Sequence, residues 1–136
     1  MSNAVFVDTS AWYAALDRDD ANHAAAAQHL HRLSERRRPL LTTNLVVGES
    51  YTLLRRRLGA RAAHAFLRSV RRDPLVRRTF VREAWEEEAE RLLEQYDDQP
   101  FSYVDATSFV TMRRLGIQDV LTFDQDFTVA GFTPVS

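Results

Sequence analysis

Cysteine is absent from this sequence of 136 residues, which excludes disulfide bonds, zinc sites built from thiolates and cysteine nucleophiles. The absence also agrees with a reducing compartment. The N-terminal segment lacks the basic start and the long apolar stretch of a secretory signal peptide, and no apolar run approaches the roughly 20 residues that span a bilayer. We therefore expect a cytoplasmic protein that does not enter a membrane.

Lysine is absent as well, since each of the 18 residues counted as Lys or Arg is an arginine. Its absence excludes P-loop nucleotide hydrolases and Schiff-base enzymes, both of which need a lysine. It also argues against a phosphatase that forms an aspartyl-phosphate, because such folds pair a strand-end aspartate with an essential lysine. A GC-rich genome is the simplest explanation for arginine in place of lysine.

The net charge of −1 conceals an uneven distribution of charge along the chain. Ten arginines and a single acid, Asp73, lie between residues 55 and 82. Eight acids and a single base, Arg91, follow between residues 83 and 98. Two interpretations remain open: both segments are solvated faces of helices, or the arginines form a basic surface for the phosphates of a nucleic acid.

The length suits one domain, residues 1–136, with one hydrophobic core. Short β-branched runs alternate with longer stretches of helical character. The predicted strands cover residues 5–7, 40–42, 76–81, 119–123 and 132–135. The predicted helices cover about residues 9–16, 21–38, 44–58, 60–71, 83–96 and 103–115. This alternation is typical of a three-layer α/β/α protein, in which helices cover both faces of a mostly parallel sheet.

Carboxylates directly follow two of the predicted strands. Asp8 ends the apolar run of the stretch VFVDTS, and Asp124 ends that of DVLTFDQDF, with Asp126 two residues further on. Parallel α/β sheets bind ligands beyond the carboxyl ends of their strands, so we expect these side chains to face one crevice. Taken alone, Asp8 could equally belong to the turn that leaves the strand.

Two further carboxylates lie among apolar residues on predicted helices. Glu49 has leucines one turn away on either side, and Asp105 has phenylalanines in the same places. A buried carboxylate without a partner is costly or becomes protonated, so each needs a cation or a donor nearby. The simpler alternatives are that Glu49 reaches an arginine on the wet side of its helix, and that Asp105 caps its helix.

Together these carboxylates predict a site for a divalent metal ion. Clustered acids repel one another in a low dielectric, and a divalent cation allows them to remain ionised. Oxygen ligands favour Mg²⁺ or Mn²⁺ over zinc. One or two such ions, held by carboxylates and water, can activate water for the hydrolysis of a phosphodiester bond.

Four ordered blocks of this sequence resemble the PIN-domain nucleases, and among them the VapC-type ribonuclease toxins of toxin–antitoxin pairs. The blocks read VFVDTSAW, TTNLVVGESYTLL, FSYVDATSFVTMRRLGI and DVLTFDQDFTVAGF, whereas residues 60–98 match only in general character. The resemblance implies a Rossmann-like α/β/α fold and Mg²⁺-dependent cleavage of RNA. It matches the four acids of the family to Asp8, Glu49, Asp105 and Asp124.

The resemblance also implies roles for residues around these four acids. Asp126 fits a variable fifth acid, which would contact the metal ion through water. The hydroxyls of Thr9 and Ser108 are expected to lie beside the metal ligands. Apart from the resemblance, the run Arg55, Arg56 and Arg57 lies just past the core of the Glu49 helix. It could guide a phosphate backbone, and it could equally be a solvated helix end.

The partners implied by the resemblance are an RNA substrate and a small antitoxin, whose tail would enter the acidic crevice. We also expect a homodimer, with the apolar helices 9–16 and 44–54 as candidate surfaces for either protein partner. Two alternatives remain: a housekeeping PIN-type nuclease that processes RNA without an antitoxin, and a non-catalytic scaffold. The intact set of four acids argues against the scaffold.

Overall fold

The computed structural model describes residues 3–136, so Met1 and Ser2, which the predicted domain includes, lie outside the described residues. Its centre is a sheet with the strand order β3-β2-β1-β4-β5. The strands are β1 (Val5–Val7), β2 (Leu40–Thr43), β3 (Val76–Thr79), β4 (Asp119–Leu121) and β5 (Thr133–Pro134). Each pair of neighbours is parallel, which confirms the predicted α/β class.

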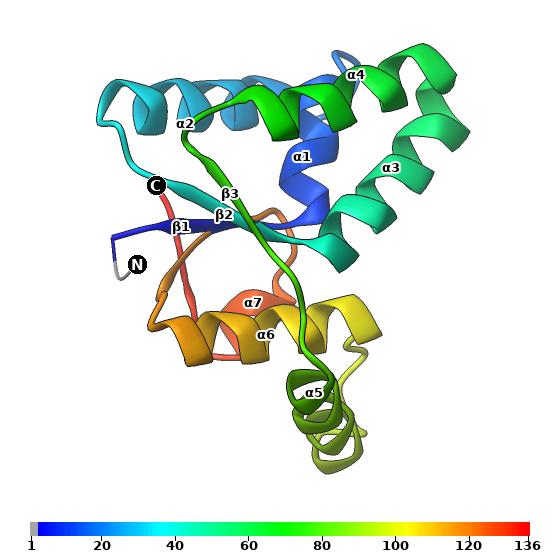
Figure 1. Cartoon of the computed structure of the whole chain (residues 1–136), viewed down its shortest axis with the longest axis vertical. Coiled ribbons are helices and arrows are strands. Elements are labelled where there is room, and N and C mark those ends of the chain that lie inside the picture. Colours follow the sequence, from blue (N-terminus) through cyan, green and yellow to red (C-terminus); the bar gives the residue numbers. More distant parts are fainter. Residues whose placement is uncertain (1–2) are drawn as a thin grey trace.

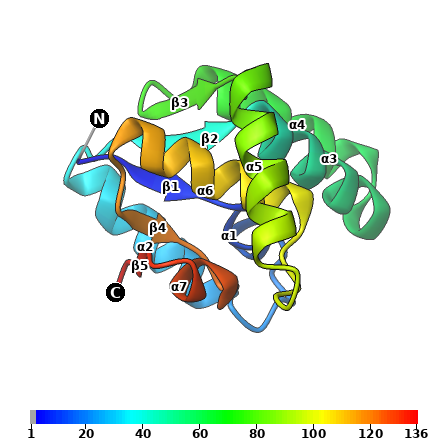
Figure 2. The same ribbon diagram turned by 90° about the horizontal axis from the view of Figure 1, so that it is seen from below.

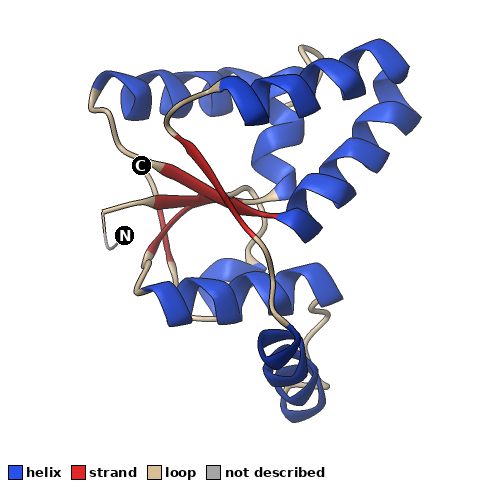
Figure 3. Ribbon diagram, in the orientation of Figure 1, coloured by secondary structure: helices blue, strands red, loops and turns tan. Residues whose placement is uncertain are grey.

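Helices cover both faces of this sheet (Figures 1 and 3). One layer contains α1 (Thr9–Leu16), α2 (His23–Glu35), α3 (Asn44–Leu58) and α4 (Ala60–Arg72). The other contains α5 (Glu83–Gln95), α6 (Tyr103–Leu115) and α7 (Asp126–Val129). Figure 2 views the second layer from below, with α5 alongside α6. The arrangement confirms the predicted three layers.

Strands β3 and β4 end earlier than predicted. Beyond their ends, side-chain oxygens accept backbone N–H groups that would otherwise bond to a neighbouring strand. The backbone N–H of Phe123 donates to Oγ of Ser10 at 2.9 Å, so β4 stops at Leu121. The backbone N–H of Val81 donates to Oδ1 of Asn44 at 2.8 Å, and β3 stops at residue 79. Beyond β4 lies the short helix α7, which was not predicted from the sequence.

Helix α2 and strand β5 are also shorter than predicted. Helix α2 starts at His23 because Oδ1 of Asp20 accepts the backbone N–H of Asn22 at 2.8 Å and forms a turn there. Its end comes before residue 38, since Arg37 adopts a left-handed conformation with a φ of 53°. Strand β5 covers only two residues, 133–134.

Aromatic side chains hold the second helical layer against the sheet. The fully buried ring of Phe109, on α6, makes edge contacts with Phe101 at 5.1 Å and Phe127 at 4.9 Å between centroids. Phe127 in turn lies 6.2 Å from Phe6 on β1. Since α6 carries Asp105 and α7 carries Asp126, this packing fixes the two elements that present these acids.

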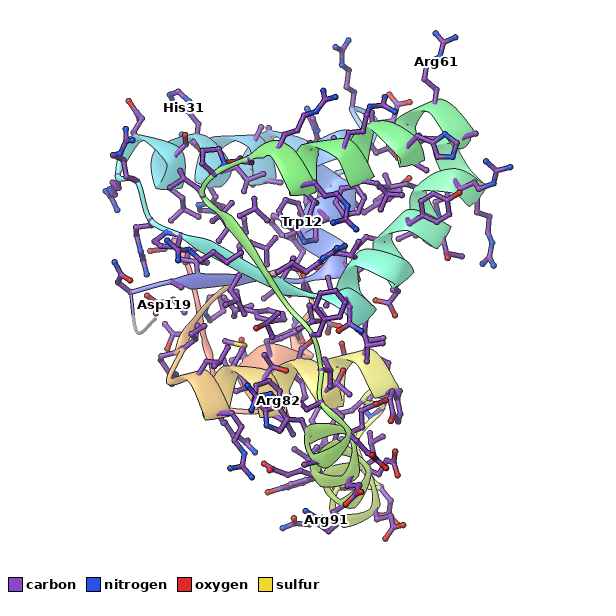
Figure 4. The ribbon with its side chains drawn as sticks, in the orientation of Figure 1. Trp12, His31, Arg61, Arg82, Arg91 and Asp119 are labelled. Carbon is purple, nitrogen blue, oxygen red and sulfur yellow. The ribbon has the colours of Figure 1, made fainter. Side chains whose placement is uncertain are left out.

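Helix α1 is a core element rather than the apolar docking surface that the sequence suggested. Residues 11–14 are buried, and α1 packs against α2 and α3. Trp12 makes an edge contact with Phe66 at 5.7 Å, inside the molecule (Figure 4). Helix α3 likewise turns three apolar side chains inward, Val46, Val47 and Leu54.

Three helices, α1, α3 and α6, begin with a side-chain cap at their N-terminus. Asp8 caps α1, Thr43 caps α3, and Ser102 caps α6, each through a side-chain oxygen that accepts a backbone N–H. These caps set the angle at which each helix leaves its strand or loop. Among residues 3–136, the structure contains no helix that combines the length and the hydropathy of a membrane span.

Candidate active site

An open cleft of about 860 Å³ lies at the carboxyl ends of β1 and β4, along α3 from Asn44 to Arg56 and beside the first turn of α6. Figure 1 shows both helices beginning at this end of the sheet. The cleft is lined by all five predicted acids, Asp8, Glu49, Asp105, Asp124 and Asp126. The expectation that the strand-end carboxylates face one crevice therefore agrees with the structure.

Asp8 is the most enclosed of these acids, with 6% of its surface exposed. Its Oδ1 accepts the N–H of Ala11 at 3.2 Å, as the N-cap of α1. Its backbone N–H donates to the carbonyl of Leu121 on β4 at 3.3 Å. Asp8 is therefore the N-cap of α1 and also lines the cleft, so its structural role at the end of the strand leaves the carboxylate available to a site there.

Two hydroxyls that were not assigned to the site from the sequence orient Asp8. Ser10 Oγ donates to Oδ1 at 2.8 Å, and Thr122 Oγ1 donates to Oδ2 at 2.9 Å. Each hydroxyl also accepts a backbone N–H, from Phe123 and Asp124 respectively, both at 2.9 Å. Each hydroxyl thus accepts one backbone N–H, and its own proton is donated to Asp8. The signal in the sequence was a hydroxyl residue within two positions of each strand-end aspartate.

Asp105, Asp124 and Asp126 form the tightest group of acids in the cleft. Carboxylate oxygens of the three residues lie within 4.8 Å of one another. Asp124 Oδ1 accepts the backbone N–H of Asp126 at 2.9 Å, which ties α7 to the end of β4. Oδ2 of Asp105 accepts the backbone N–H of Ser102 at 3.1 Å in a capping box. The N-cap of α6 is therefore Ser102 and not Asp105, so the capping alternative named the wrong position. Asp105 is the third residue of the helix, where it completes the capping box and also lines the cleft.

Crowding and burial raise the pKa of three of these acids. Burial raises the pKa of Asp8 to about 7 and that of Asp105 to about 6, and the negative charge of Asp124 adds to both increases. The pKa of Asp126 is also raised, first by burial and then by Asp124. A cation placed among such carboxylates would stabilise their ionised form.

The donor set fits Mg²⁺ or Mn²⁺. None of the ion pairs among residues 3–136 involves any of the five acids, so their charge is not neutralised by arginine or histidine. All the available donors are oxygens, which these ions prefer.

The environment of Glu49 is more exposed than the sequence predicted. We expected a carboxylate on a buried face, or one paired with an arginine, but Glu49 is exposed and Oε1 accepts the hydroxyl of Thr9 at 2.6 Å. Thr9 Oγ1 also accepts the hydroxyl of Ser50 at 3.3 Å. Helix α3 turns the carboxylate towards the open cleft, and Thr9 contacts Glu49 rather than its neighbour Asp8.

Of Ser108 and the three arginines 55–57, which were expected near the acids, only Arg56 lines the cleft. Among the residues that the structure describes, Ser108 does not line the cleft, and its buried hydroxyl has no hydrogen-bond partner. Arg56 lines the cleft, because it lies two helical turns after Glu49. Arg57 instead lies over the ring of Tyr13, 5.1 Å from the centroid, and Arg55 faces solvent.

Comparison with known proteins agrees with this geometry. The PIN domain family model matches residues 5–132. The 23S rRNA-specific endonuclease VapC20 of two Mycobacterium tuberculosis strains, CDC 1551 / Oshkosh and ATCC 25618 / H37Rv, is 44% identical over 132 residues. The alignment covers 96% of this chain and 97% of VapC20.

Solved structures show the same relationship. The crystal structure of M. tuberculosis VapC20, described as a Sarcin-Ricin loop cleaving toxin, has a TM-score of 0.87 and covers 97% of this chain and 98% of its own. FitAcB from Neisseria gonorrhoeae shares the fold at a TM-score of 0.69 and 14% identity, with 97% and 96% covered. The chain therefore belongs to the PIN-domain family and, within it, to the VapC-type endonuclease toxins.

Proposed function

We propose that this protein is the toxin of a toxin–antitoxin pair and cleaves RNA in the acidic cleft by metal-dependent hydrolysis. The observation that carries the proposal is the convergence of Asp105, Asp124 and Asp126 beside Asp8, with no arginine or histidine paired to them in residues 3–136. Membership of the VapC-type endonucleases supports hydrolysis of phosphodiester bonds. The intact acids favour catalysis over a scaffold role.

Asp8, Asp105, Asp124 and Glu49 would hold one or two Mg²⁺ or Mn²⁺ ions, with Asp126 in contact through water. When bound, such an ion lowers the pKa of a coordinated water and offsets negative charge on the phosphate. Asp8 Oδ1 accepts two hydrogen bonds and Oδ2 accepts one. Oδ2 therefore has more lone-pair capacity for a cation, and Ser10 and Thr122 hold it in place.

Glu49 and Arg56 act from the α3 wall of the cleft. The hydrogen bond from Thr9 occupies Oε1 of Glu49, which leaves Oε2 to accept a proton or to join the metal ligands. Arg56 lies on the same face of the helix and lines the same cleft. Its guanidinium would bind a phosphate of the RNA in a bidentate manner and position the strand over the acids.

The substrate we propose is a structured ribosomal RNA. VapC20 is named a 23S rRNA-specific endonuclease and a Sarcin-Ricin loop cleaving toxin, and the similarity of this chain to it runs over nearly the full length of both. A similar cleft on a similar fold supports a similar substrate class. We propose the sarcin–ricin loop of 23S rRNA as the first RNA to test.

The partner we propose is a small antitoxin in the cytoplasm, and the chain would act as a single nuclease domain and as a homodimer. A peptide that ends in the cleft would need a cationic group, because five acids line it. An antitoxin arginine could pair with these carboxylates and exclude the metal ion. Co-purification with the product of any short open reading frame found to overlap the upstream end of this gene, after co-expression of the two, tests this partner.

The decisive experiment measures cleavage of a synthetic sarcin–ricin hairpin with Mg²⁺, with Mn²⁺ and with EDTA. We expect cleavage with either metal, none with EDTA, and none by Asp8→Asn. Asp119→Asn is the matched control, because Asp119 lies at the opposite end of β4 and pairs with Arg38 at 3.0 Å. Cleavage that survives EDTA, or Asp8→Asn that cuts as well as the parent, would show the mechanism to be wrong.

A further inference from the structure

Phe80 is an exposed aromatic ring directly after strand β3, at the edge of the sheet. It is 63% exposed, more than any other large apolar side chain in residues 3–136. The guanidinium carbon of Arg78 lies 5.2 Å from the ring centroid, within the range of a cation–π contact. An isolated exposed ring needs no explanation, so the surroundings of Phe80 decide what the ring can do.

A hollow of about 290 Å³ lies beside this ring, between α4 and β3. Its lining combines the apolar side chains Val70 and Val76, the ring of Phe80, and the two cations Arg71 and Arg78. Apolar walls and an aromatic face suit a flat ring, while guanidinium groups suit a phosphate. This is the chemistry that recognises a nucleotide.

The surroundings of the hollow are strongly basic. Five exposed arginines lie on α4, on β3 and just after β3, namely Arg68, Arg71, Arg72, Arg77 and Arg82. None of the ion pairs among residues 3–136 involves an arginine of the segment 55–82. The single acid there, Asp73, accepts the backbone N–H of Leu75 at 2.9 Å. The field around the hollow therefore attracts phosphates.

The chain leads from the hollow directly to the wall of the acidic cleft. Phe80 is followed by Val81, whose backbone N–H donates to Oδ1 of Asn44 at 2.8 Å. Asn44 lines the cleft itself. In Figure 1, β3 lies at the near edge of the sheet and runs to the end at which α3 begins, and Figure 4 places Arg82 where the chain continues towards α5. A strand of RNA could pass from one depression to the other across Asn44.

We propose that the hollow beside Phe80 binds one unpaired nucleotide of the RNA substrate. The base stacks on Phe80, and Arg71 and Arg78 hold the adjacent phosphate while the strand continues past Asn44 to the acids. The inference rests on the proposed ribonuclease function and adds a reason for choosing loops, because RNA loops offer unstacked bases that a duplex does not. It also assigns a role to part of the basic segment whose function the sequence left open.

The test uses binding rather than cleavage, in the inactive Glu49→Gln background, with a fluorescent sarcin–ricin hairpin and a fully paired RNA duplex of equal length. We expect Phe80→Leu to weaken hairpin binding by about tenfold, the usual effect of losing one base–aromatic stack, and to leave duplex binding unchanged. Phe80→Trp should restore hairpin binding.

A second measurement locates the stacked base. Hairpins are prepared in which the loop bases are replaced one at a time by 2-aminopurine, whose fluorescence falls when it stacks on an aromatic ring. At one loop position we expect quenching by the protein that carries Phe80 and by the Phe80→Trp variant. The Phe80→Leu variant, at a concentration that saturates the hairpin, should not quench that position.

Arginine variants test the phosphate contacts in the same assay. Arg78→Gln should lower the slope of log Kd against log salt by about one. Arg91→Gln is the control, since Arg91 points away from the body of the protein on α5 (Figure 4), and it should change neither the affinity nor the slope. An unchanged melting temperature for each variant shows that the fold is intact.

Three results would overturn the inference. They are hairpin binding by Phe80→Leu equal to that of its parent, an equal loss of hairpin and duplex binding, and loss of antitoxin binding with RNA binding intact. The last result would assign the surface to a protein partner. A wild-type protein that binds the hairpin through Phe80 but cleaves no RNA would instead refute the proposed function alone.

Discussion

Thr122 Oγ1 donates a hydrogen bond of 2.9 Å to Oδ2 of Asp8, although 114 positions separate the two residues in the chain. The contact exists because β1 and β4 are parallel neighbours, with Val7 opposite Leu121. Asp8 and Thr122, which follow these two residues, therefore lie side by side at the edge of the sheet. Asp8 is thus oriented by the strand that also delivers Asp124. This pairing suggests that the two hydroxyls around Asp8 are positioning residues.

We expect Thr122→Val to lower cleavage activity or metal affinity by about tenfold or more, as is usual when a group that orients a metal ligand is lost. Thr122→Ser should keep most of the activity, because it retains the hydroxyl. Isothermal titration with Mn²⁺ and single-turnover cleavage measure the two quantities. Equal activity of the Val and Ser variants would show that the hydrogen bond does not matter.

The pH dependence of stability follows from the raised pKa values. The pKa of an aspartate in the unfolded chain is near 3.8, whereas burial raises the pKa of Asp8 to about 7 and that of Asp105 to about 6 in the folded protein. Between these values the folded protein holds protons that the unfolded chain has released, so stability without metal should fall as pH rises from about 4 to about 7. Thermal denaturation in EDTA measures this trend.

Divalent metal should reverse this trend, because it binds the ionised carboxylates. The increase in melting temperature caused by Mn²⁺ should be larger at about pH 8 than at about pH 5. Asp8→Asn removes the most shifted of these groups, so it should flatten the metal-free curve and reduce the effect of Mn²⁺. A metal-free melting temperature that rises steadily through neutral pH would contradict the assignment.

Arg56→Gln should raise KM for RNA more than it lowers kcat, since Arg56 lines the cleft and we assign it to the RNA backbone. The salt slope of binding should fall by about one, as for the loss of one phosphate contact. Arg55→Gln provides a control on the same helix, because Arg55 faces solvent outside the cleft. Equal effects of the two substitutions would mean that only the total charge of the helix end matters.

Phe109→Ala should destabilise the protein by about 3–5 kcal/mol, the range for removing a large aromatic side chain from a core. Phe109 is fully buried and contacts Phe101, Phe127 and Phe132. Phe80→Ala should change stability by less than about 0.5 kcal/mol, since that ring is largely exposed. Denaturant unfolding of both variants compares the two; similar losses would contradict the described core.

Much of the fold was predictable because its signals are local. Residues 5–7 formed the strand that the β-branched run predicted, and the helix predicted over residues 103–115 has the same bounds in the structure as α6. The end of β4 and helix α7 were not predictable, because Ser10, distant in the chain, takes the N–H of Phe123. Apolar spacing alone likewise placed Glu49 on a buried face, although the cleft leaves its carboxylate exposed.

Local sequence determined most of the strands and helices, though not α7, and the acids that follow β1 and β4, since caps, turns and periodicity depend on neighbouring residues. The absence of lysine and cysteine alone excluded several chemistries. Tertiary packing decided which groups meet: Asp105 with Asp124 and Asp126, and Thr9 with Glu49. Those distances depend on strand register and on the packing of α3, α6 and α7 against the sheet, which no local pattern contains.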